Sequence, residues 1–390
     1  MKPRHLIYIN IVFIGLMLFS AGMVYQFMTG KKPLSMLQAI THRNSHVTVE
    51  TGQCTNKEPL NLSGAETKAL QTLAVYQQAC HSFATNTMMI FTAMPVSNSQ
   101  AQRYAAEDAV LLKDFAKHGV RPLVIAEPTD KDGTNIDFAK LADGSLNTVF
   151  ETYFTQLKAN GITDEQLGIW NPLPEANLPY WQNSHPQYFS PAINNYLTAL
   201  KAQFPQAHTS VLLNSATYEN SDFNWENGDY ESLVPYVKDI KPGLVEFAGL
   251  QGFPWMASQG GSASIFNAAE FLNPDLLMEM AEHLGTKKVW FNTGTFESKY
   301  TLDPSRTISV QPERRKAIFD TINDQALVLQ KQGYQVAINV FAEDKSKTSE
   351  ETNWSYWSDN KPFNSKSTPV ITDFINQITN EKIDFWLFDK

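Results

Sequence analysis

Residues 168–181 of the chain, GIWNPLPEANLPYW, surround one glutamate with prolines and aromatic side chains. Proline fixes φ and stiffens a loop, and an apolar aromatic setting disfavours the charged form of a carboxyl group and so raises its pKa. A glutamate in that setting can donate a proton near neutral pH. The segment therefore predicts general acid–base chemistry at Glu175. The alternative is an ordinary loop acid paired with a surface cation.

Amide and aromatic side chains elsewhere suggest what such an acid would act on. Amides and acids bind hydroxyl groups, and flat rings stack on the apolar face of a pyranose, so these residue types favour a sugar ligand. The candidates for sugar contact are Trp170, Asn177, Trp181, Asn214, Gln251, Trp255, Asn292, Asp344, Trp354 and Trp357. Trp170 and Trp290 lie inside strand-like runs, and for these two we rate packing above sugar contact.

Cleavage of a glycosidic bond requires a second carboxylate besides the proton donor. Three acids are candidates: Glu246, Glu297 and Asp344. Glu246 would point into a barrel if Phe247 points out, and an unpaired acid there would need a role or a basic partner. Glu297 could instead be an exposed ion-pair partner. Asp344 lies beside a polar insertion that could form a rim carrying Trp354 and Trp357, or a disordered loop.

No metal or cofactor is expected. The 8 histidines are scattered and no zinc motif is present. Residues 130–137, DKDGTNID, are rich in oxygen ligands, but the glycine falls at the wrong place for an EF-hand, so we interpret them as a turn.

The elements that must position these residues alternate regularly after about residue 46. Strand-like runs at 46–50, 87–95, 121–128, 166–177, 208–218, 243–255, 287–296 and 335–344 are separated by helical patterns. Eight such repeats predict an α/β fold, a (β/α)8 TIM barrel. A doubly wound open sheet is the alternative, but its glycine-rich phosphate loops are missing.

The active site of such a barrel lies at the C-terminal ends of the strands. Glu175 follows the fourth strand-like run and therefore lies at this end. Polar residues expected at the same end are Thr92, Glu127, Asn171, Glu175, Asn177, Asn214, Tyr218, Glu246, Gln251, Asn292, Thr293, Glu297, Asn339, Glu343 and Asp344.

Residues 121–181 resemble mannanase-type glycoside hydrolases of family 26, within the larger (β/α)8 glycoside hydrolase superfamily. The resemblance rests on Glu127-Pro128 at a strand end, on Asp143-Gly144-Ser145 before a helix, and on Glu175-Ala176-Asn177 with tryptophan nearby. It implies that Glu175 is the acid/base. Two positions depart from the family pattern: Pro174 precedes the acid/base, where a polar residue is usual, and Asn292 lies where the nucleophile is expected. Asparagine cannot form a glycosyl ester, but its amide would still bind a sugar hydroxyl.

Composition favours a globular protein that does not bind nucleic acid. The chain has 390 residues, 43% hydrophobic and 18% charged, and a net charge of -9 without clustered Lys and Arg. Binding to phosphates requires such clusters. We expect a carbohydrate ligand and a monomer.

The N-terminus carries an uncharged run of apolar residues at 6–28, long enough to span a bilayer. We interpret 1–28 as an uncleaved signal anchor, 29–45 as a linker and 46–390 as the barrel domain. A cleaved signal peptide, which would give a secreted protein, is the alternative. Cys54 and Cys80 are the only cysteines, and they suit one disulfide in an oxidising compartment, although two buried thiols are also compatible. The expected location is the cell membrane, single-pass, with the domain outside.

Three readings of function follow. The first is a membrane-anchored glycoside hydrolase with Glu175 as general acid. The second is a non-hydrolytic glycan-binding protein that has lost its nucleophile at Asn292. The third, a tethered structural domain that binds protein, explains the anchor but not the polar and aromatic strand ends.

Overall fold

The computed structural model describes residues 50–51, 87–117, 121–131, 133–178, 181–215, 232–252, 272–293, 298–299, 308–309, 312–340 and 352–353. The chain divides into two units, Met1–His46 and Val47–Lys390, and all described residues belong to the second. None of the described helices combines the length and the apolar composition that a membrane crossing requires. The expected anchor, the linker, Cys54 and Cys80 lie outside the described residues.

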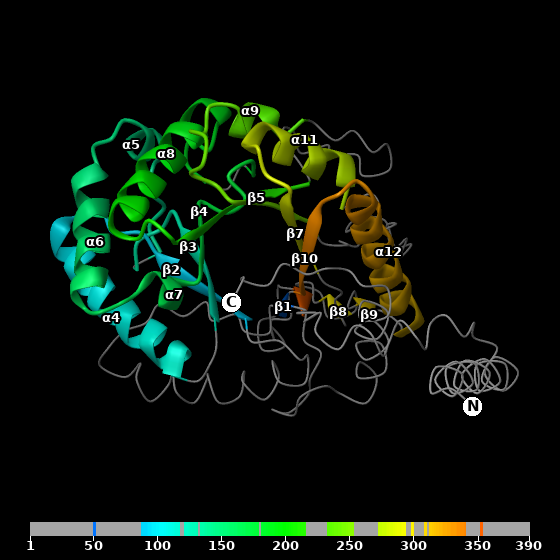
Figure 1. The fold of residues 1–390 in the computed structure, drawn as a ribbon, viewed down its shortest axis with the longest axis horizontal. Helices are drawn as coiled ribbons and strands as arrows, with labels where there is room; N and C mark the ends of the chain where they lie inside the picture. The colour runs from blue at the N-terminus through cyan, green and yellow to red at the C-terminus, as the bar shows by residue number, and fades with distance from the viewer. Residues whose placement is uncertain are drawn as a thin grey trace, which may run out of the picture. The chain divides into compact units, whose positions relative to one another are not determined.

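Parallel strands pair in a closed ring, in the order β1-β10-β7-β6-β5-β4-β3-β2 (Figure 1). Their bounds are β1 Glu50–Thr51, β2 Thr87–Ala93, β3 Arg121–Glu127, β4 Ile169–Pro172, β5 His208–Asn214, β6 Phe247–Gln251, β7 Lys288–Thr293 and β10 Gln335–Val340. The short β1 pairs with β10 on one side and with β2 on the other. This α/β barrel confirms the predicted fold class, and the doubly wound sheet is excluded.

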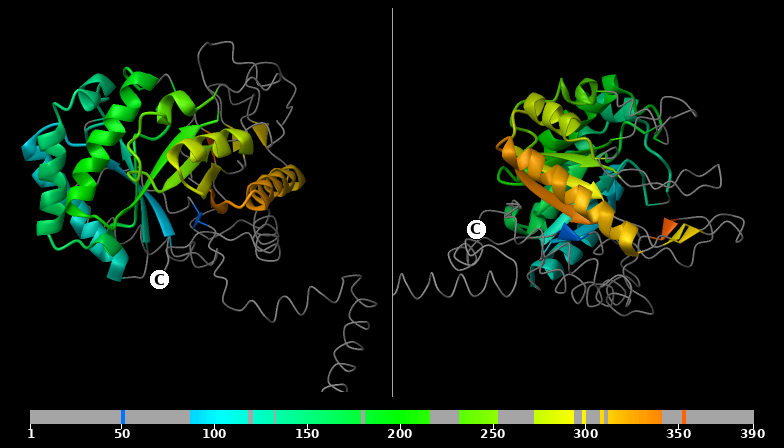
Figure 2. Two further views of the ribbon diagram at one scale, coloured as in Figure 1. Left: turned by 45° about the horizontal axis from the view of Figure 1, so that its top comes forward. Right: turned by 90° about the vertical axis from the view of Figure 1, so that its right-hand side faces the viewer.

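Helices cover the outside of the ring, as the two turned views also show (Figure 2). They are α4 Asn98–Lys117, α5 Phe138–Ala142, α6 Asn147–Ala159, α7 Asp164–Leu167, α8 Pro186–Gln203, α9 Val234–Val237, α11 Pro274–Leu284 and α12 Pro312–Lys331. Helix α6 packs between α4 and α8, and α12 packs on α11 and β10. A small antiparallel sheet of β11 Thr352–Asn353, β8 Ser298–Lys299 and β9 Ile308–Ser309 lies apart from the barrel strands in the pairing.

Local sequence explains where the elements around β4 begin. Thr163 and Gln166 form a reciprocal capping box that starts α7. Gly168 then turns the chain into β4 with φ of 69°, and a Cβ added there would lie 2.0 Å from the carbonyl oxygen of Pro122. Only glycine fits both the positive φ, paired here with ψ of -143°, and the close approach to β3. Gly168 thereby sets the position of the strand that leads to Glu175.

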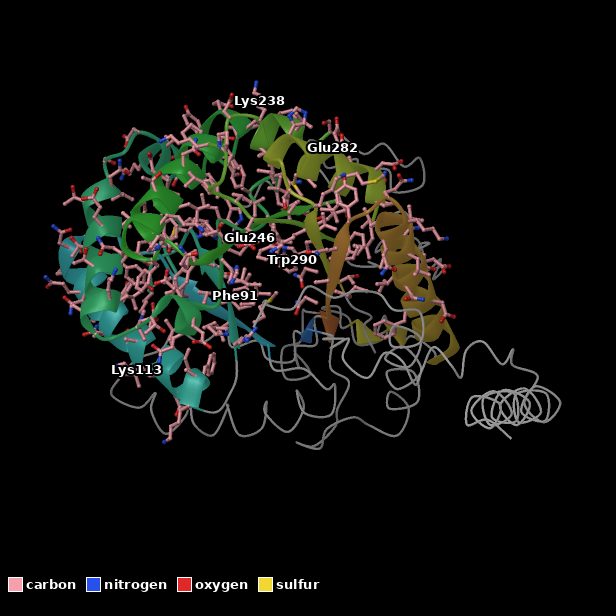
Figure 3. The ribbon with its side chains drawn as sticks, viewed as in Figure 1. Phe91, Lys113, Lys238, Glu246, Glu282 and Trp290 are labelled. Carbon is pink, nitrogen blue, oxygen red and sulfur yellow. The ribbon has the colours of Figure 1, made fainter. Side chains whose placement is uncertain are left out.

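Alternation along the strands separates an outer from an inner face. On β4, Trp170 packs outward against Phe154 and Tyr196 of the helical layer, with ring centroids 5.8 Å apart for Phe154, and its Nε1 donates to the Tyr196 hydroxyl. On β7, Trp290 lies inside the ring (Figure 3). Its Nε1 donates to Ser210 Oγ at 2.8 Å, and its indole lies where a Cβ on Gly249 would be. The interior of the barrel is thus filled by side chains.

Candidate functional site

The segment after β4 is held between both neighbouring strands. The backbone N–H of Leu173 donates to Ala126 O of β3, and that of Glu175 donates to Leu212 O of β5, each at 2.9 Å. Leu173 and Glu175 have positive φ, 54° and 53°. Non-glycine residues in this region carry strain of order 1–3 kcal/mol and persist where the surroundings fix them. The backbone therefore fixes Glu175 in a strained conformation at the C-terminal mouth of the barrel.

The Glu175 side chain reaches across β5 to β6. Its Oε1 accepts a hydrogen bond from Asn214 Nδ2 at 2.8 Å and another from Gln251 Nε2. Asn214 is the last residue of β5 and Gln251 the last of β6. The structure therefore brings together three residues that the sequence predicted for the site.

Asn177 joins the same loop to the end of β5. Its Nδ2 donates to Asn214 O at 2.7 Å, and its Oδ1 accepts from Asn214 N at 2.8 Å. Asn177 is buried. Because both ends of its amide bind backbone, Asn177 shapes the loop.

The amide row continues to the ends of β7 and β10. Asn292 Nδ2 donates to Gln251 Oε1, and Asn339 Nδ2 donates to Asn292 Oδ1, both at 2.5 Å. Asn292 is 3% exposed and Asn339 is 1% exposed. A connected series of amides thus runs from Asn339 to the carboxylate of Glu175.

Asn171 is fully buried within β4, and both polar atoms of its amide lack a hydrogen-bond partner among the residues that the structure describes. Since Trp170 faces the helices, the alternation of β4 turns Asn171 toward the barrel interior. Buried amides without partners are rare. Of the other residues expected at this end, Thr92, Glu127 and Thr293 do lie in the last two positions of their strands.

Three tryptophans in the described part of the chain differ in their surroundings. Trp181 is half-buried, packs on the core, and donates from Nε1 to Pro174 O at 3.0 Å, so it braces the loop that carries Glu175. Trp170 was a candidate sugar contact for which packing was rated higher, and its indole is buried in the helical layer, as packing requires. Trp290 packs inside the barrel, which agrees with the expectation of packing.

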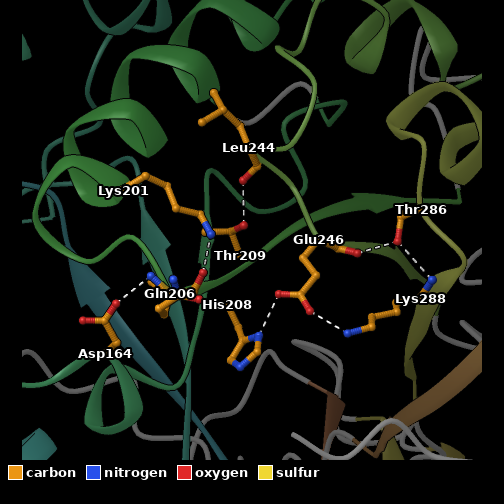
Figure 4. A network of polar contacts seen from close by, with 10 residues as sticks. Asp164, Lys201, Gln206, His208, Thr209, Leu244, Glu246, Thr286 and Lys288 are labelled. Atoms are coloured by element: carbon orange, nitrogen blue, oxygen red, sulfur yellow. Dashed lines mark hydrogen bonds and ion pairs between the residues drawn. The ribbon is translucent and has the colours of Figure 1, made fainter. Parts of the chain in front are cut away.

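Glu246 is not at this end of the barrel, which corrects its assignment as a candidate second carboxylate. It directly precedes β6, where the strands begin. Its Oε2 lies 2.7 Å from His208 Nδ1 and its Oε1 accepts from Lys288 Nζ at 2.6 Å (Figure 4). Burial raises the pKa of Glu246, but the hydrogen bonds from His208 and Lys288 outweigh it and leave the pKa below its ordinary value. Glu246 is a structural ion-pair residue at the opposite mouth.

Several predicted site residues lie outside the described residues: Tyr218, Trp255, Glu297, Glu343, Asp344, Trp354 and Trp357. Their roles stay predictions. Within the part of the chain that the structure describes, no group of three or more His, Cys, Asp or Glu side chains could hold a metal ion.

Sequence reasoning missed a buried carboxyl group on α4. Asp108 Oδ2 accepts from Tyr153 Oη at 2.5 Å and from Thr92 Oγ1 at 2.9 Å. Burial raises its pKa to about 6, opposed by these two hydrogen bonds. Asp108 lies four residues after Tyr104 and four before Leu112, both buried, so helical periodicity placed it on the inward stripe of α4.

No protein-family model matches the chain, and a search of curated proteins finds no match. Among solved structures, the chain is similar to a β-glucosidase from Thermotoga maritima in complex with deoxynojirimycin, with 12% identity, a TM-score of 0.51, and coverage of 82% of this chain and 87% of that one. It is also similar to a family 1 β-glucosidase from the same organism, with 11% identity, a TM-score of 0.50, and coverage of 83% and 87%. At this identity the likeness shows the fold alone, an α/β barrel.

Proposed function

We propose that the protein is a glycoside hydrolase that acts on a polysaccharide or oligosaccharide, with Glu175 as its general acid/base. The observation that carries the proposal is the placement of Glu175. It lies beyond β4 at the C-terminal mouth, held with φ of 53° by its backbone bond to β5, with its side chain bonded to Asn214 and Gln251. Active sites of (β/α)8 enzymes lie at this end.

The second carboxylate would come from Glu297 or Asp344. Glu297 is four residues after the end of β7, and Asp344 four after the end of β10, so both segments leave the barrel at the mouth that holds Glu175. A separation of about 5 Å between the two carboxyl groups would give retention of anomeric configuration, and about 6.5–9.5 Å would give inversion. Glu246 is not a candidate, because it lies at the opposite mouth of the barrel.

A second candidate function is glycan binding without hydrolysis. Asn292 favours it, because this amide occupies the β7 end where the resemblance to family 26 expects a nucleophile, and its side chain bonds to Gln251 and Asn339. The closer relation to mannanase-type enzymes is itself part of the proposal.

The location is proposed from the sequence. Residues 6–28 would anchor the chain in the cell membrane with the barrel outside, where Cys54 and Cys80 could form a disulfide. The ligand would be a carbohydrate, bound by a monomer.

The test is release of reducing ends from mannans, glucans, xylans and cell-wall glycans by the full-length chain in detergent micelles. Its Glu175→Gln variant should lose release by a factor of about 10²–10⁴, the usual contribution of a general acid. Glu151→Gln, the same change at an exposed position of α6, is the matched control and should keep full activity.

The two candidate functions give different results. Release that Glu175→Gln abolishes and Glu151→Gln retains supports hydrolysis. If no glycan is cleaved while one binds saturably to both the native chain and the Glu175→Gln variant, the enzyme proposal fails and the binding function is supported.

A further inference from the structure

The amide row has a single hydrogen-bond direction. An ionised carboxylate only accepts hydrogen bonds, so Gln251 must turn Nε2 toward Glu175 and Oε1 away from it. Oε1 of Gln251 then requires a donor, and Asn292 supplies Nδ2. Oδ1 of Asn292 in turn accepts from Asn339 Nδ2. One carboxylate therefore accounts for the orientation of three amides on three strands.

The far end of the row does not impose this orientation. Asn339 Oδ1 is buried and accepts no hydrogen bond in the described part of the chain, and its Nδ2 makes only a further weak contact with Met89 Sδ at 3.9 Å. If Asn339 were turned over, its oxygen would meet the oxygen of Asn292. Since no described residue outside the row fixes either end of the Asn339 amide, the Glu175 end sets the direction.

We propose that Gln251, Asn292 and Asn339 form a positioning chain that orients Glu175 and responds as a unit to its protonation. Asn292, which replaces the expected nucleophile, is a link in this chain. The significance for catalysis rests on the proposed function of Glu175, whereas the chain itself exists whether or not the protein hydrolyses a glycan.

Burial makes the three amides act together. All three are buried, with exposed fractions of 8%, 3% and 1%, so water does not readily replace a lost partner. In a low-dielectric interior, hydrogen bonds in series polarise one another, and the effect passes from link to link. A proton added to Glu175 removes the charge that aligns Gln251, and the change reaches Asn339 only through Asn292.

The test uses the side-chain amide nitrogen resonances of the full-length chain, labelled with ¹⁵N, in detergent micelles during a pH titration. We expect the resonances of Gln251, Asn292 and Asn339 to move with one common midpoint, and all three movements to vanish in Glu175→Gln. In Asn292→Leu, the Gln251 movement should persist while the Asn339 movement is lost. Asn292→Ala repeats this break with a smaller side chain if the leucine variant does not fold.

Asn195 on α8 is the matched control. Its amide donates to the carbonyls of Leu141 and Ala142, away from the chain, so its resonance should stay constant. The proposal is overturned if Asn339 does not titrate with Glu175, or if it still does so when Asn292 is replaced. Because the experiment needs no substrate, absence of glycan cleavage would contradict the proposed function and leave this result intact.

Discussion

Asp108 and Glu246 are carboxyl groups outside the candidate site whose pKa values shift in opposite directions. Asp108 is buried against two hydroxyl groups, and burial dominates, so its pKa rises to about 6. Glu246 is half-buried between His208 and Lys288, and these donors lower its pKa. The two residues therefore give the folded state opposite dependences on pH.

The raised pKa of Asp108 makes the folded state bind a proton more tightly than the unfolded state. Its contribution to stability is fully present below the ordinary value of 3.8 and is lost as pH rises through about 6. Relative to Asp108→Asn, the free energy of unfolding of the native chain should fall by about 2–3 kcal/mol between pH 3.5 and pH 8. Urea unfolding followed by tryptophan fluorescence measures this, with Asp239→Asn, an exposed position, as control. A difference that does not change with pH would contradict the prediction.

Glu246 should show the opposite sign. Its pKa is lowered, so its contribution is present above the ordinary value of 4.5 and is lost as pH falls through the folded value. Glu246→Gln should reduce the free energy of unfolding at pH 7 by roughly 1 kcal/mol, since the pair is partly exposed. The loss should shrink in acid. A double-mutant cycle with Lys288→Met checks the cause, and additive effects of the two substitutions would show that the ion pair contributes nothing.

The sequence identified individual site residues better than their partners. Glu175, Asn214, Gln251 and Asn292 were predicted at strand ends from the barrel pattern alone, and the structure places them together. Glu246 was assigned to the wrong end because the strand-like run 243–255 is longer than β6, which begins at Phe247, so Glu246 precedes the strand and lies where it starts. The hydrogen bonds between the amides depend on which residues of neighbouring strands lie opposite each other, and the sequence of one strand does not specify that pairing.

At the scale of the element, the entry into β4 controls where Glu175 lies. Gly168 combines φ of 69° with a close approach to Pro122, whereas Gly285, after α11, has φ of 68° and no atom within 4 Å of an added Cβ. The two glycines share a positive φ but differ in ψ, which is -143° at Gly168 and 29° at Gly285, and only Gly168 also approaches a neighbouring strand closely.

Gly168→Ala should therefore destabilise the fold more than Gly285→Ala. The loss at Gly285 should be about 1 kcal/mol, from the left-handed conformation alone. The loss at Gly168 should exceed it by at least ~2 kcal/mol, because β4 must move away from β3 to admit the methyl group. Chemical unfolding of both variants measures the difference. Equal losses would show that the β3–β4 contact adapts without cost.

Elements were predictable where a repeated pattern defined them. All eight strand-like runs correspond to barrel strands, because the alternation of buried runs with amphipathic helices has few other solutions. Trp170 and Trp290 show the limit: both are inside strands and both are buried, but one packs outside the ring and the other inside it. Their opposite faces follow from strand alignment, which composition and periodicity leave open.

For the whole molecule, fold and function are separate questions. The structural likeness to β-glucosidases at 11–12% identity establishes a shared barrel, and a barrel hosts many chemistries. In this chain the candidate site combines one glutamate of positive φ with a row of amides, and the sequence carries an apolar N-terminal run at 6–28. A tethered barrel would act on glycans that lie within reach of its membrane.

The final prediction concerns the proposed membrane anchor at residues 6–28. If 6–28 spans the bilayer, the full-length chain should remain in the membrane pellet after alkaline carbonate extraction, because about 20 apolar residues bury stably in hydrocarbon. Deleting 6–28 should release the protein into the supernatant.

Protease added outside intact cells should digest the full-length chain. The native chain should run differently on reduced and non-reduced gels if Cys54 and Cys80 form a disulfide, and the Cys54→Ser, Cys80→Ser double variant should lose that difference. Recovery of the full-length chain in the carbonate supernatant would contradict the anchor. Resistance to external protease would contradict the outward orientation, and with it access to glycans outside the cell.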